Sequence, residues 1–471
     1  MMPVEPRRTK IVATIGPVTS SPEALRDLLQ LVDGTRLNFS HGTHEHHAAT
    51  AKLVRELREE LDRPVALIAD LQGPKLRVGD LPGGPVELER GSRVTVAGED
   101  VARDGDLPVA PAVVGSVLQR GNDVLIDDGS VRLRVERVER GRALCEVIVG
   151  GTVSSHKGVN LPGITLPIPS LTRKDIDDLQ FALELGCDFV ALSFVRSGSD
   201  VQALKTLIEA SGSTAHVIAK IEKAEAVAVL DDVLRESDAV MVARGDLGVE
   251  IGVAEVPLLQ KRIIQRALER GKPVITATQM LESMIHAPEP TRAEASDVAN
   301  AVLDGTSAIM LSGETAIGEF PLEAVAYMDR IARAVEPHLG YRHEIPTADQ
   351  QPTIGQAMSN AACDIAEALA ARALLVPTYT GRTASGVARL RPRRPIIGLT
   401  HHEYALHHMS LEWGVTPVGI AEAPDVEELW RSSLEAARST GIVESGDRVV
   451  ITAGTAVNIP GSTNVIKVDT A

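Results

Sequence analysis

The feature that most limits what this chain can fold into is a repeated alternation of short apolar runs with amphipathic helical stretches. Runs rich in Val, Ile and Ala are expected as strands, and a helical stretch follows each of them. The expected strands are residues 10–16, 35–41, 64–71, 187–194, 216–222, 239–244, 273–279 and 307–312. Eight βα units of this kind predict an α/β protein built on a closed (β/α)8 barrel rather than an open sheet.

The pattern changes between the third and fourth of these strands. Over residues 79–167 helical periodicity disappears, and glycine, proline and alternating residues take its place. Val131, Leu133 and Val135 alternate with charged residues before a turn near Gly141, which indicates a β-hairpin. We expect an inserted, barrel-like β domain that acts as a lid, because insertions in βα loops lie at the active end of such a barrel.

A second α/β segment follows the barrel. A long alanine-rich helix is expected over residues 354–371. Strands are expected at residues 373–377, 395–399, 448–453 and 465–468. The expected domains are a catalytic barrel of residues 1–78 and 168–340, a lid of residues 79–167, and a carboxy-terminal domain of residues 341–471.

Composition limits the classes of partner. The chain has 48 Lys and Arg against 64 Asp and Glu, a formal net charge of −16. That sign is wrong for a nucleic-acid or anionic-membrane surface. No stretch approaches the roughly 18 apolar residues of a membrane span, and no apolar run typical of a signal peptide follows the amino terminus. Three widely spaced cysteines fit a reducing cytoplasm better than a disulfide framework.

Polar side chains gather at the carboxyl ends of the expected strands, where a barrel of this class carries its chemistry. The candidates are Arg36, Asn38, Ser40, Asp70, Lys75, Arg77, Ser193, Arg196, Lys220, Glu222, Arg244, Asp246, Thr278, Ser312 and Glu314. Taken alone, Lys220 with Glu222 is an ordinary structural pair, and Arg244 with Asp246 is a salt bridge that could close the barrel end. Their convergence on one face makes a functional site the better interpretation.

The types of these residues indicate the chemistry. Glu222 and Asp246 offer hard oxygen ligands that suit Mg or Mn. Lys220 lies two residues from Glu222 and therefore shares its side of the strand. Gly245 and Asp246 could present backbone amides to a carboxylate or phosphate at the start of a short helix. Cationic side chains across the mouth complete a site for an anionic, phosphorylated substrate; they are Arg36, Lys75 and Arg77.

Long motifs identify the chain as similar to one family. They are TKIVATIGP (9–17), RLNFSHGTHEHH (36–47), KGVNLPG (157–163), AKIEKAEA (219–226), DAVMVARGDLGVEI (238–251), PVITATQMLESM (273–284) and PTRAEASDVANAVLDGTSAIMLSGETAIGEFP (290–321). These motifs resemble pyruvate kinase, and the resemblance covers essentially the whole chain. It implies a cytoplasmic, Mg-dependent homotetramer of glycolysis that transfers the phosphoryl group of phosphoenolpyruvate to ADP, giving pyruvate and ATP.

The resemblance also implies roles for matching residues. Glu222 and Asp246 would hold the divalent metal. Lys220 would neutralise charge on the phosphoryl oxygens and the developing enolate. Thr278 would lie in the proton relay that turns the enolate into pyruvate, and the final proton donor stays open. The residues expected to bind substrate are Arg36, Lys75, Arg77, Ser193, Lys220, Gly245, Asp246 and Thr278, of which Arg36, Lys220 and Thr278 are also expected to be catalytic.

One departure from the family concerns the monovalent cation. Many pyruvate kinases require K+, and the residues that match its ligands are Asn38, Ser40, Asp70 and the carbonyl of Leu71. Those members have Glu where this chain has Lys75. An ammonium beside the phosphoryl site could supply the charge that K+ otherwise provides, so we expect that K+ is not required. Asn38, Ser40 and Asp70 are then expected to orient Arg36 and Lys75, and weak cation binding stays open.

The carboxy-terminal domain carries a hydroxyl-rich loop at an expected strand-to-helix turn. The residues that could cradle a phosphate there are Thr378, Thr380, Gly381, Arg382 and Thr383. The loop resembles the family's effector loop, so we expect a phosphorylated metabolite to bind there and activate the enzyme. Tyr379 replaces the Lys or Glu of some members, which leaves the effector open. Residues 461–464 are expected to pack beside the loop.

Two other functions stay open at this point. A metal-enolate lyase or aldolase could use the same carboxylate pair. That function would not explain Lys220 and Lys75 together with a phosphate-binding arginine and a lid. A catalytically silent phosphometabolite sensor would use only residues 378–383. The presence of Lys220, Glu222 and Asp246 argues against it, because a silent relative would be free to lose them.

Overall fold

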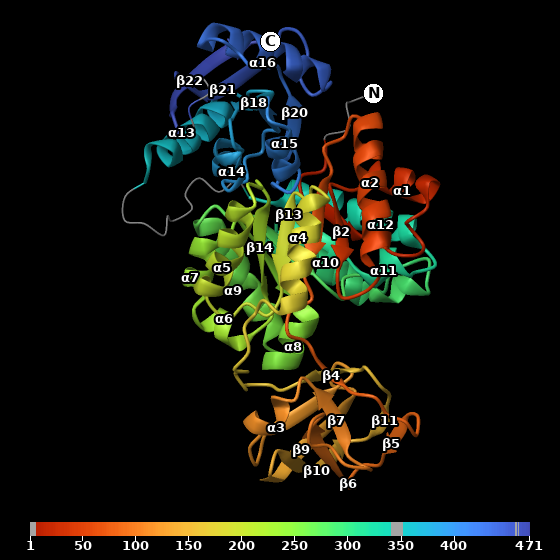
Figure 1. The fold of residues 1–471 in the computed structure, drawn as a ribbon. Coiled ribbons are helices and arrows are strands. Elements are labelled where there is room, and N and C mark those ends of the chain that lie inside the picture. The colour runs from red at the N-terminus through yellow and green to blue at the C-terminus, as the bar shows by residue number, and fades with distance from the viewer. Residues whose placement is uncertain (1–5, 341–351, 457–458, 460) are drawn as a thin grey trace.

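A computed structural model describes residues 6–340, 352–456, 459 and 461–471 of the chain. Within these residues a central barrel lies between a small all-β domain and an α/β domain, with the two outer domains at opposite ends (Figure 1). The boundary expected at residue 341 lies outside the described residues.

All eight strands expected for the barrel form. They are β1 (Lys10–Thr14), β2 (Gly34–Asn38), β3 (Ala66–Asp70), β13 (Phe189–Leu192), β14 (His216–Ile221), β15 (Ala239–Ala243), β16 (Val274–Ala277) and β17 (Ala308–Leu311). They pair in parallel and close in the order β1-β17-β16-β15-β14-β13-β3-β2, which confirms the predicted fold class. All eight end before the expected last residue, and several of the residues beyond them carry polar side chains to the barrel mouth.

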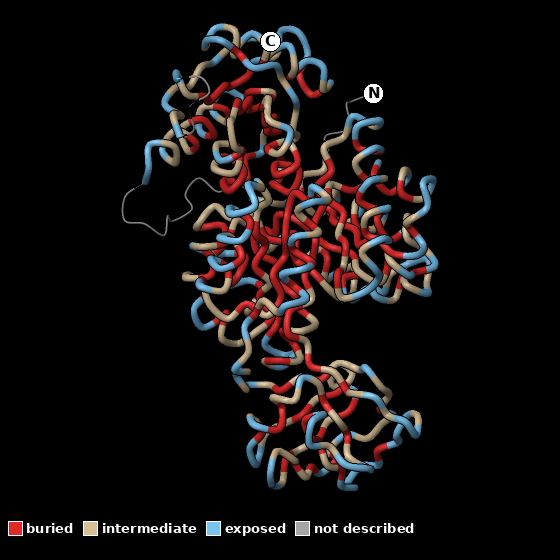
Figure 2. The backbone as a smooth tube through the Cα atoms, viewed as in Figure 1, coloured by how far each residue is buried: buried red, intermediate tan, exposed pale blue. Residues whose placement is uncertain are grey.

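Helices surround the barrel, and the longer ones bury an apolar face against it. They are α1 (Pro22–Leu29), α2 (His44–Glu60), α4 (Arg173–Glu184), α5 (Gly198–Ala210), α6 (Ala224–Ala228), α7 (Leu230–Glu236), α8 (Arg244–Ile251), α9 (Val256–Glu269), α10 (Arg292–Asp304), α11 (Gly313–Ala316) and α12 (Pro321–Val335), with 3-10 turns at Glu282–Ile285 and Glu336–His338. In α1, for example, Leu25, Leu28 and Leu29 are fully buried. Buried residues fill the centre of the barrel region (Figure 2).

The inserted domain is a second closed barrel. Its strands are β4 (Leu76–Val78), β6 (Arg93–Gly98), β7 (Leu107–Ala110), β8 (Asp123–Ile126), β9 (Val131–Glu139), β10 (Arg142–Val149) and β12 (Gly158–Asn160). A two-stranded sheet and a short helix accompany it; they are β5 (Val86–Leu88), β11 (Gly151–Val153) and α3 (Val114–Val117). The expected hairpin is β9 paired with β10.

The insertion begins earlier than the boundary expected at residue 79. Strand β4 pairs with β7 and β12 of the inserted barrel. Leu76 and Val78 are buried in that domain's own core, so β4 belongs to the lid by both hydrogen bonding and packing.

The carboxy-terminal domain is a five-stranded sheet in the order β20-β19-β18-β21-β22. Its elements are α13 (Ile354–Ala368), β18 (Ala373–Pro377), α14 (Arg382–Ala388), β19 (Ile396–Thr400), α15 (Glu403–Met409), β20 (Val415–Gly419), α16 (Val426–Ser439), β21 (Arg448–Gly454) and β22 (Thr463–Thr470). Strand β20 was not expected. It lies at the sheet edge and contains Pro417, which a strand tolerates there but which weakens the strand pattern in the sequence.

The carboxy-terminal domain docks on the amino-terminal end of the barrel. Helix α15 brings His407 to Asp188, the residue directly before β13, with Nδ1 and Oδ1 3.0 Å apart. The carboxyl ends of the barrel strands therefore face the lid. No helix in the described ranges is long and apolar enough to cross a membrane.

Candidate active site

One buried carboxylate joins two cations at the barrel mouth. Arg36, in the middle of β2, donates from Nε to Oδ2 of Asp70 at 2.7 Å, and its Nη1 donates to Thr14 Oγ1 at 3.0 Å. The other oxygen of Asp70 lies 3.3 Å from Nζ of Lys220. Burial by itself raises the pKa of Asp70, but Lys220 and Arg36 outweigh it and hold that pKa below its usual value. Asp70 is therefore ionised and fixes both cations.

Lys220 is held from several sides. Its Nζ donates to Ser193 Oγ at 2.6 Å and lies 3.5 Å from Oε2 of Glu222. Ser193 in turn donates to the carbonyl of Leu71 at 2.7 Å. Burial alone lowers the pKa of Lys220, but the surrounding carboxylates outweigh it, so the pKa is raised and the side chain is an ammonium. The buried hydroxyl of Ser193 thus supports Lys220 instead of lying open to a substrate.

Glu222 and Asp246 form the expected carboxylate pair. Burial raises the pKa of Glu222, and the negative charge of Asp246 adds to that rise. Oε1 of Glu222 accepts from the backbone amide of Phe194 at 2.6 Å, which fixes the carboxylate. No group of three or more His, Cys, Asp or Glu able to hold a metal occurs in the part of the chain that the structure describes. A divalent cation between these two carboxylates would relieve their repulsion, so the donor set fits Mg or Mn.

Thr278 faces the start of α8. The backbone amide of Gly245 donates to Thr278 Oγ1 at 2.8 Å, and that hydroxyl donates to the carbonyl of Ala277 at 2.7 Å. The strand-end residues Gly245, Asp246 and Thr278 line one cleft together with Lys75. The side chains of Arg36, Asp70, Lys220 and Glu222 do not line this cleft, but the charge of Asp246 acts on both Lys220 and Glu222, which links the cleft to the buried cluster around Asp70.

The residues expected around a monovalent cation are only partly joined. Asn38 accepts from the backbone amide of Ser40 at 3.2 Å. Asp70 orients Arg36 as expected, but its second oxygen serves Lys220 and not Lys75. The backbone amide of Lys75 donates to the carbonyl of Gly73 at 2.9 Å, whereas its side chain forms no hydrogen bond or ion pair with any described residue and lines the cleft. Arg77, from lid strand β4, donates to the carbonyl of His156 at 3.1 Å.

The salt bridge between Arg244 and Asp246 that was the structural alternative to a functional site does not form. Arg244 Nη1 instead lies 2.6 Å from Oδ2 of Asp297 on α10, 53 residues away in sequence. Sequence spacing alone could not show this pairing, because Asp297 lies on a helix that only the closed barrel brings near.

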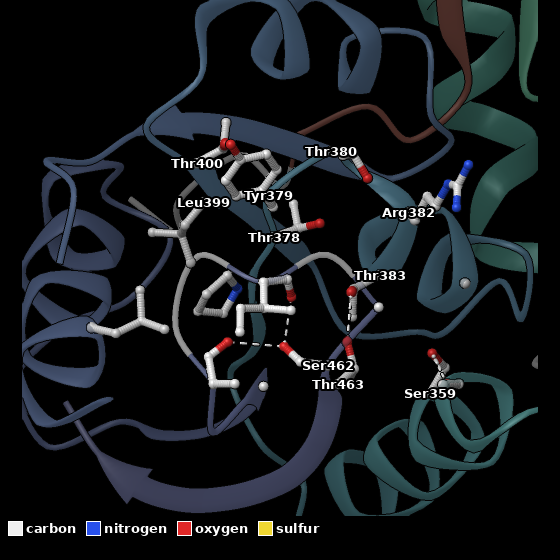
Figure 3. Close-up of a pocket in the computed structure, with 18 of the residues that line it drawn as sticks. Ser359, Thr378, Tyr379, Thr380, Arg382, Thr383, Leu399, Thr400, Ser462 and Thr463 are labelled. Atoms are coloured by element: carbon white, nitrogen blue, oxygen red, sulfur yellow. Dashed lines mark hydrogen bonds between the residues drawn. The ribbon is translucent and has the colours of Figure 1, made fainter. Parts of the chain in front are cut away.

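The carboxy-terminal loop lines a separate cavity of about 250 Å³. Thr378, Thr383, Ser462 and Thr463 surround one hollow, while the Arg382 guanidinium extends away from these hydroxyls (Figure 3). Thr383 and Thr463 share a hydrogen bond of 2.9 Å, so residues 461–464 pack beside the loop as expected. Thr380 and Gly381 belong to the same loop, and Gly381 has a φ of 88° at the start of α14.

Comparison with known proteins decides the family. The family description "Pyruvate kinase, barrel domain" matches residues 6–325. The chain belongs to the pyruvate kinase family. The description "Pyruvate kinase, alpha/beta domain" matches residues 356–469, so both the barrel and the carboxy-terminal domain of a pyruvate kinase are present.

Individual relatives agree with the family descriptions. The chain is 46% identical to "Pyruvate kinase 2" of Synechocystis sp. over 98% of its own length and 79% of the relative's. It is 44% identical to "Pyruvate kinase" of Corynebacterium glutamicum, with 98% and 97% of the two chains covered. A pyruvate kinase of Agrobacterium vitis is also 44% identical, over 98% and 96%. These findings favour neither the lyase nor the sensor.

Sequence reasoning missed three contributions to this pyruvate kinase site. Thr14 accepts from Arg36, the backbone of Phe194 holds Glu222, and Arg244 contacts the loop that carries Thr278. Thr14 lies within the first family motif, which was the only available signal. The Phe194 amide and the carbonyls bound by Arg244 are backbone groups, so the residue types at these positions do not indicate the two contacts.

Proposed function

We propose that this chain catalyses phosphoryl transfer from phosphoenolpyruvate to ADP, with Arg36 and Lys220 as the cations that receive the transferring group. The observation that carries the proposal is the shared carboxylate of Asp70, which fixes both cations within 3.3 Å. Preorganised charge of this kind stabilises a phosphoryl-transfer transition state because no reorganisation is needed during the reaction.

The remaining residues have separate roles in this proposal. The backbone amides of Gly245 and Asp246 receive the substrate carboxylate at the start of α8. Lys220 neutralises negative charge as the enolate forms, since its ammonium is buried and ionised. Thr278 passes a proton toward the methylene carbon. Ser193 holds Lys220 in place.

A divalent metal completes the site. Glu222 and Asp246 would hold Mg or Mn, which when bound supplies positive charge to substrate oxygens. The raised pKa of Glu222 beside Asp246 supports this assignment, because a cation between the two carboxylates lowers the cost of ionising both.

We propose further that the enzyme does not require K+. Lys75 lines the cleft with Gly245, Asp246 and Thr278 and has no partner among the described side chains. Its ammonium is therefore available to supply charge to a bound substrate. The matched positions Asn38, Ser40, Asp70 and Leu71 remain, and Asp70 is already engaged by two cations.

Regulation is assigned to the carboxy-terminal cavity. Its hydroxyl-rich lining, with Thr378, Thr380, Arg382 and Thr383 on one loop that also contains Gly381, supports binding of an activating phosphorylated metabolite. We also assign a homotetrameric, cytoplasmic enzyme, as the family resemblance implies.

The test is steady-state pyruvate formation from phosphoenolpyruvate and ADP with Mg, in a tetramethylammonium background with and without K+. Fructose 1,6-bisphosphate, ribose 5-phosphate, glucose 6-phosphate and AMP are added in turn. Turnover without K+ and a lower half-saturation with one phosphate support the proposals. Turnover only with K+ removes the role of Lys75, and no turnover under any condition removes the reaction.

A further inference from the structure

The loop that carries Thr278 has an uncommon backbone. Thr278 and Gln279 both have positive φ, 67° and 53°, and neither is glycine. A β-branched residue in this region is a genuine outlier, because its side chain crowds the following carbonyl. Such a conformation persists only where the surroundings hold it, and it concentrates at functional sites.

The Arg244 side chain supplies that hold. Its Nη2 donates to the carbonyls of Thr278 at 2.8 Å and Gln279 at 3.1 Å. Its Nε is shared between the carbonyls of Ala277 at 3.3 Å and Thr278 at 3.2 Å. One planar guanidinium thus contacts three successive carbonyls of the turn. A lysine could not do this, because it presents a single nitrogen without a fixed fork.

The guanidinium is itself fixed. Arg244 is only 8% exposed, and its Nη1 lies 2.6 Å from Asp297 and 3.4 Å from Gln260. It is also the residue directly before Gly245, whose amide donates to the Thr278 hydroxyl. The same residue therefore starts α8 and fixes the turn that faces it.

We propose that Arg244 is a positioning residue that sets the Thr278 hydroxyl for proton transfer to the enolate carbon. By holding three carbonyls it fixes the left-handed turn, and the turn fixes Oγ1 against the start of α8. The inference rests on the proposed role of Thr278 in the proton relay. Arg244 touches no reacting atom in this scheme, and its effect on catalysis passes through Thr278.

The proton step can be measured apart from phosphoryl transfer. Protonation of the enolate is the reverse of removing a proton from the methyl group of pyruvate, so deuterium incorporation into that group in D2O, with Mg and ATP, reports this step. We expect Arg244→Lys to slow deuterium incorporation by about tenfold or more, while the KM for phosphoenolpyruvate changes by less than about threefold. If Arg244 only stabilised the fold, its replacement would not slow deuterium incorporation while leaving the KM for phosphoenolpyruvate nearly unchanged.

The decisive comparison uses Thr278→Ala, alone and with Arg244→Lys. If Arg244 acts through Thr278, adding Arg244→Lys to Thr278→Ala causes no further slowing. Additive slowing overturns the inference. Normal exchange in Arg244→Lys with slow exchange in Thr278→Ala also overturns it while the role of Thr278 stands. Normal exchange in Thr278→Ala overturns that role and the inference together.

Two further variants address the possibility that Arg244→Lys fails to fold and the general effect of replacing a buried arginine. Asp297→Asn keeps Arg244 but weakens its anchor, so it should slow exchange in the same sense even if Arg244→Lys fails to fold. Arg58→Lys is the matched control, because Arg58 is also a buried arginine, paired with Asp188 at the opposite end of the barrel. It should leave exchange unchanged, and equal slowing in this variant would overturn the inference.

Discussion

Oδ1 of Asp70 lies 3.3 Å from the ammonium nitrogen of Lys220, while Oδ2 of the same carboxylate accepts from Arg36 at 2.7 Å. Asp70 is buried at the end of β3, which pairs with β2, the strand of Arg36, and with β13, beyond which lies β14, the strand of Lys220. The distance between the cations therefore depends on one short, rigid side chain. Without this shared partner, the long side chains of Arg36 and Lys220 would each have to be ordered separately, at a greater cost in conformational entropy.

Asp70→Asn should lower kcat by about a hundredfold, because a small misplacement of catalytic charge has an effect of this order. Asparagine keeps the size of the side chain but removes the charge that holds both cations. Kinetics with phosphoenolpyruvate and ADP measure the effect. Asp33→Asn is the control, since Asp33 is half-buried and also pairs with an arginine, lying 2.8 Å from Arg7, but at the opposite end of the barrel. Equal losses in both variants would contradict a specific role for Asp70.

Lys220→Ala should lower turnover by orders of magnitude and leave the fold intact. Removing one preorganised charge or donor from a transition state typically costs about 10²- to 10³-fold in kcat. The midpoint of thermal unfolding, measured on the same preparation, separates this loss from misfolding. Wild-type turnover in the variant would remove the role given to Lys220.

Lys75→Glu should create a dependence on K+. The variant loses the ammonium that faces the cleft and gains the acid found in members that require the cation. In tetramethylammonium buffer its turnover should fall, and added K+ should restore it. The wild-type enzyme serves as its own control, and strong activation of that enzyme by K+ would contradict the prediction.

Most of the barrel could be predicted because each strand is a continuous apolar run with a helix after it. The failures have local causes. Pro417 weakened the strand pattern of the edge strand β20. Strand β4 has only three residues, and their sequence does not indicate that they pair with β7 of the lid. In the site, residue types and strand ends located Lys220, Glu222 and Asp246. The partner of Arg244 could not be predicted, because Asp297 reaches it through tertiary structure.

Thr383→Ala should abolish activation by the effector and leave basal activity unchanged. The Thr383 hydroxyl lies in the carboxy-terminal cavity, 2.9 Å from Thr463, at the opposite end of the barrel from the cleft. The measurement is half-saturation by phosphoenolpyruvate with and without the activating phosphate. Thr440→Ala, outside the cavity, controls for loss of a hydroxyl. A retained response in Thr383→Ala would place the effector elsewhere.

Two histidines pack face to face where the carboxy-terminal domain meets the barrel. The ring centroids of His216 and His408 are 3.6 Å apart, and His408 Nε2 lies 3.2 Å from the carbonyl of Asp188. Burial, together with the neighbouring His216, lowers the pKa of His408 to about 3. Burial also lowers the pKa of His216, although Asp238 opposes it. Both rings are therefore neutral in the folded protein at neutral pH.

Lowering the pH should therefore destabilise the folded protein already between pH 7 and 5, at a higher pH than the range in which carboxylates titrate. An unfolded histidine takes up a proton below its ordinary pKa of 6.5, whereas folded His408 does so only near 3. Unfolding thus binds protons in this window, and stability falls as pH falls, by up to about 1.4 kcal/mol per pH unit for His408 once the pH is below its ordinary pKa. The lowered pKa of His216 acts in the same direction. The midpoint of thermal unfolding between pH 7 and 5 should fall less steeply in His408→Gln than in the wild type. His338→Gln, at an exposed position, should keep the wild-type slope, and an unchanged slope in His408→Gln would contradict the assignment.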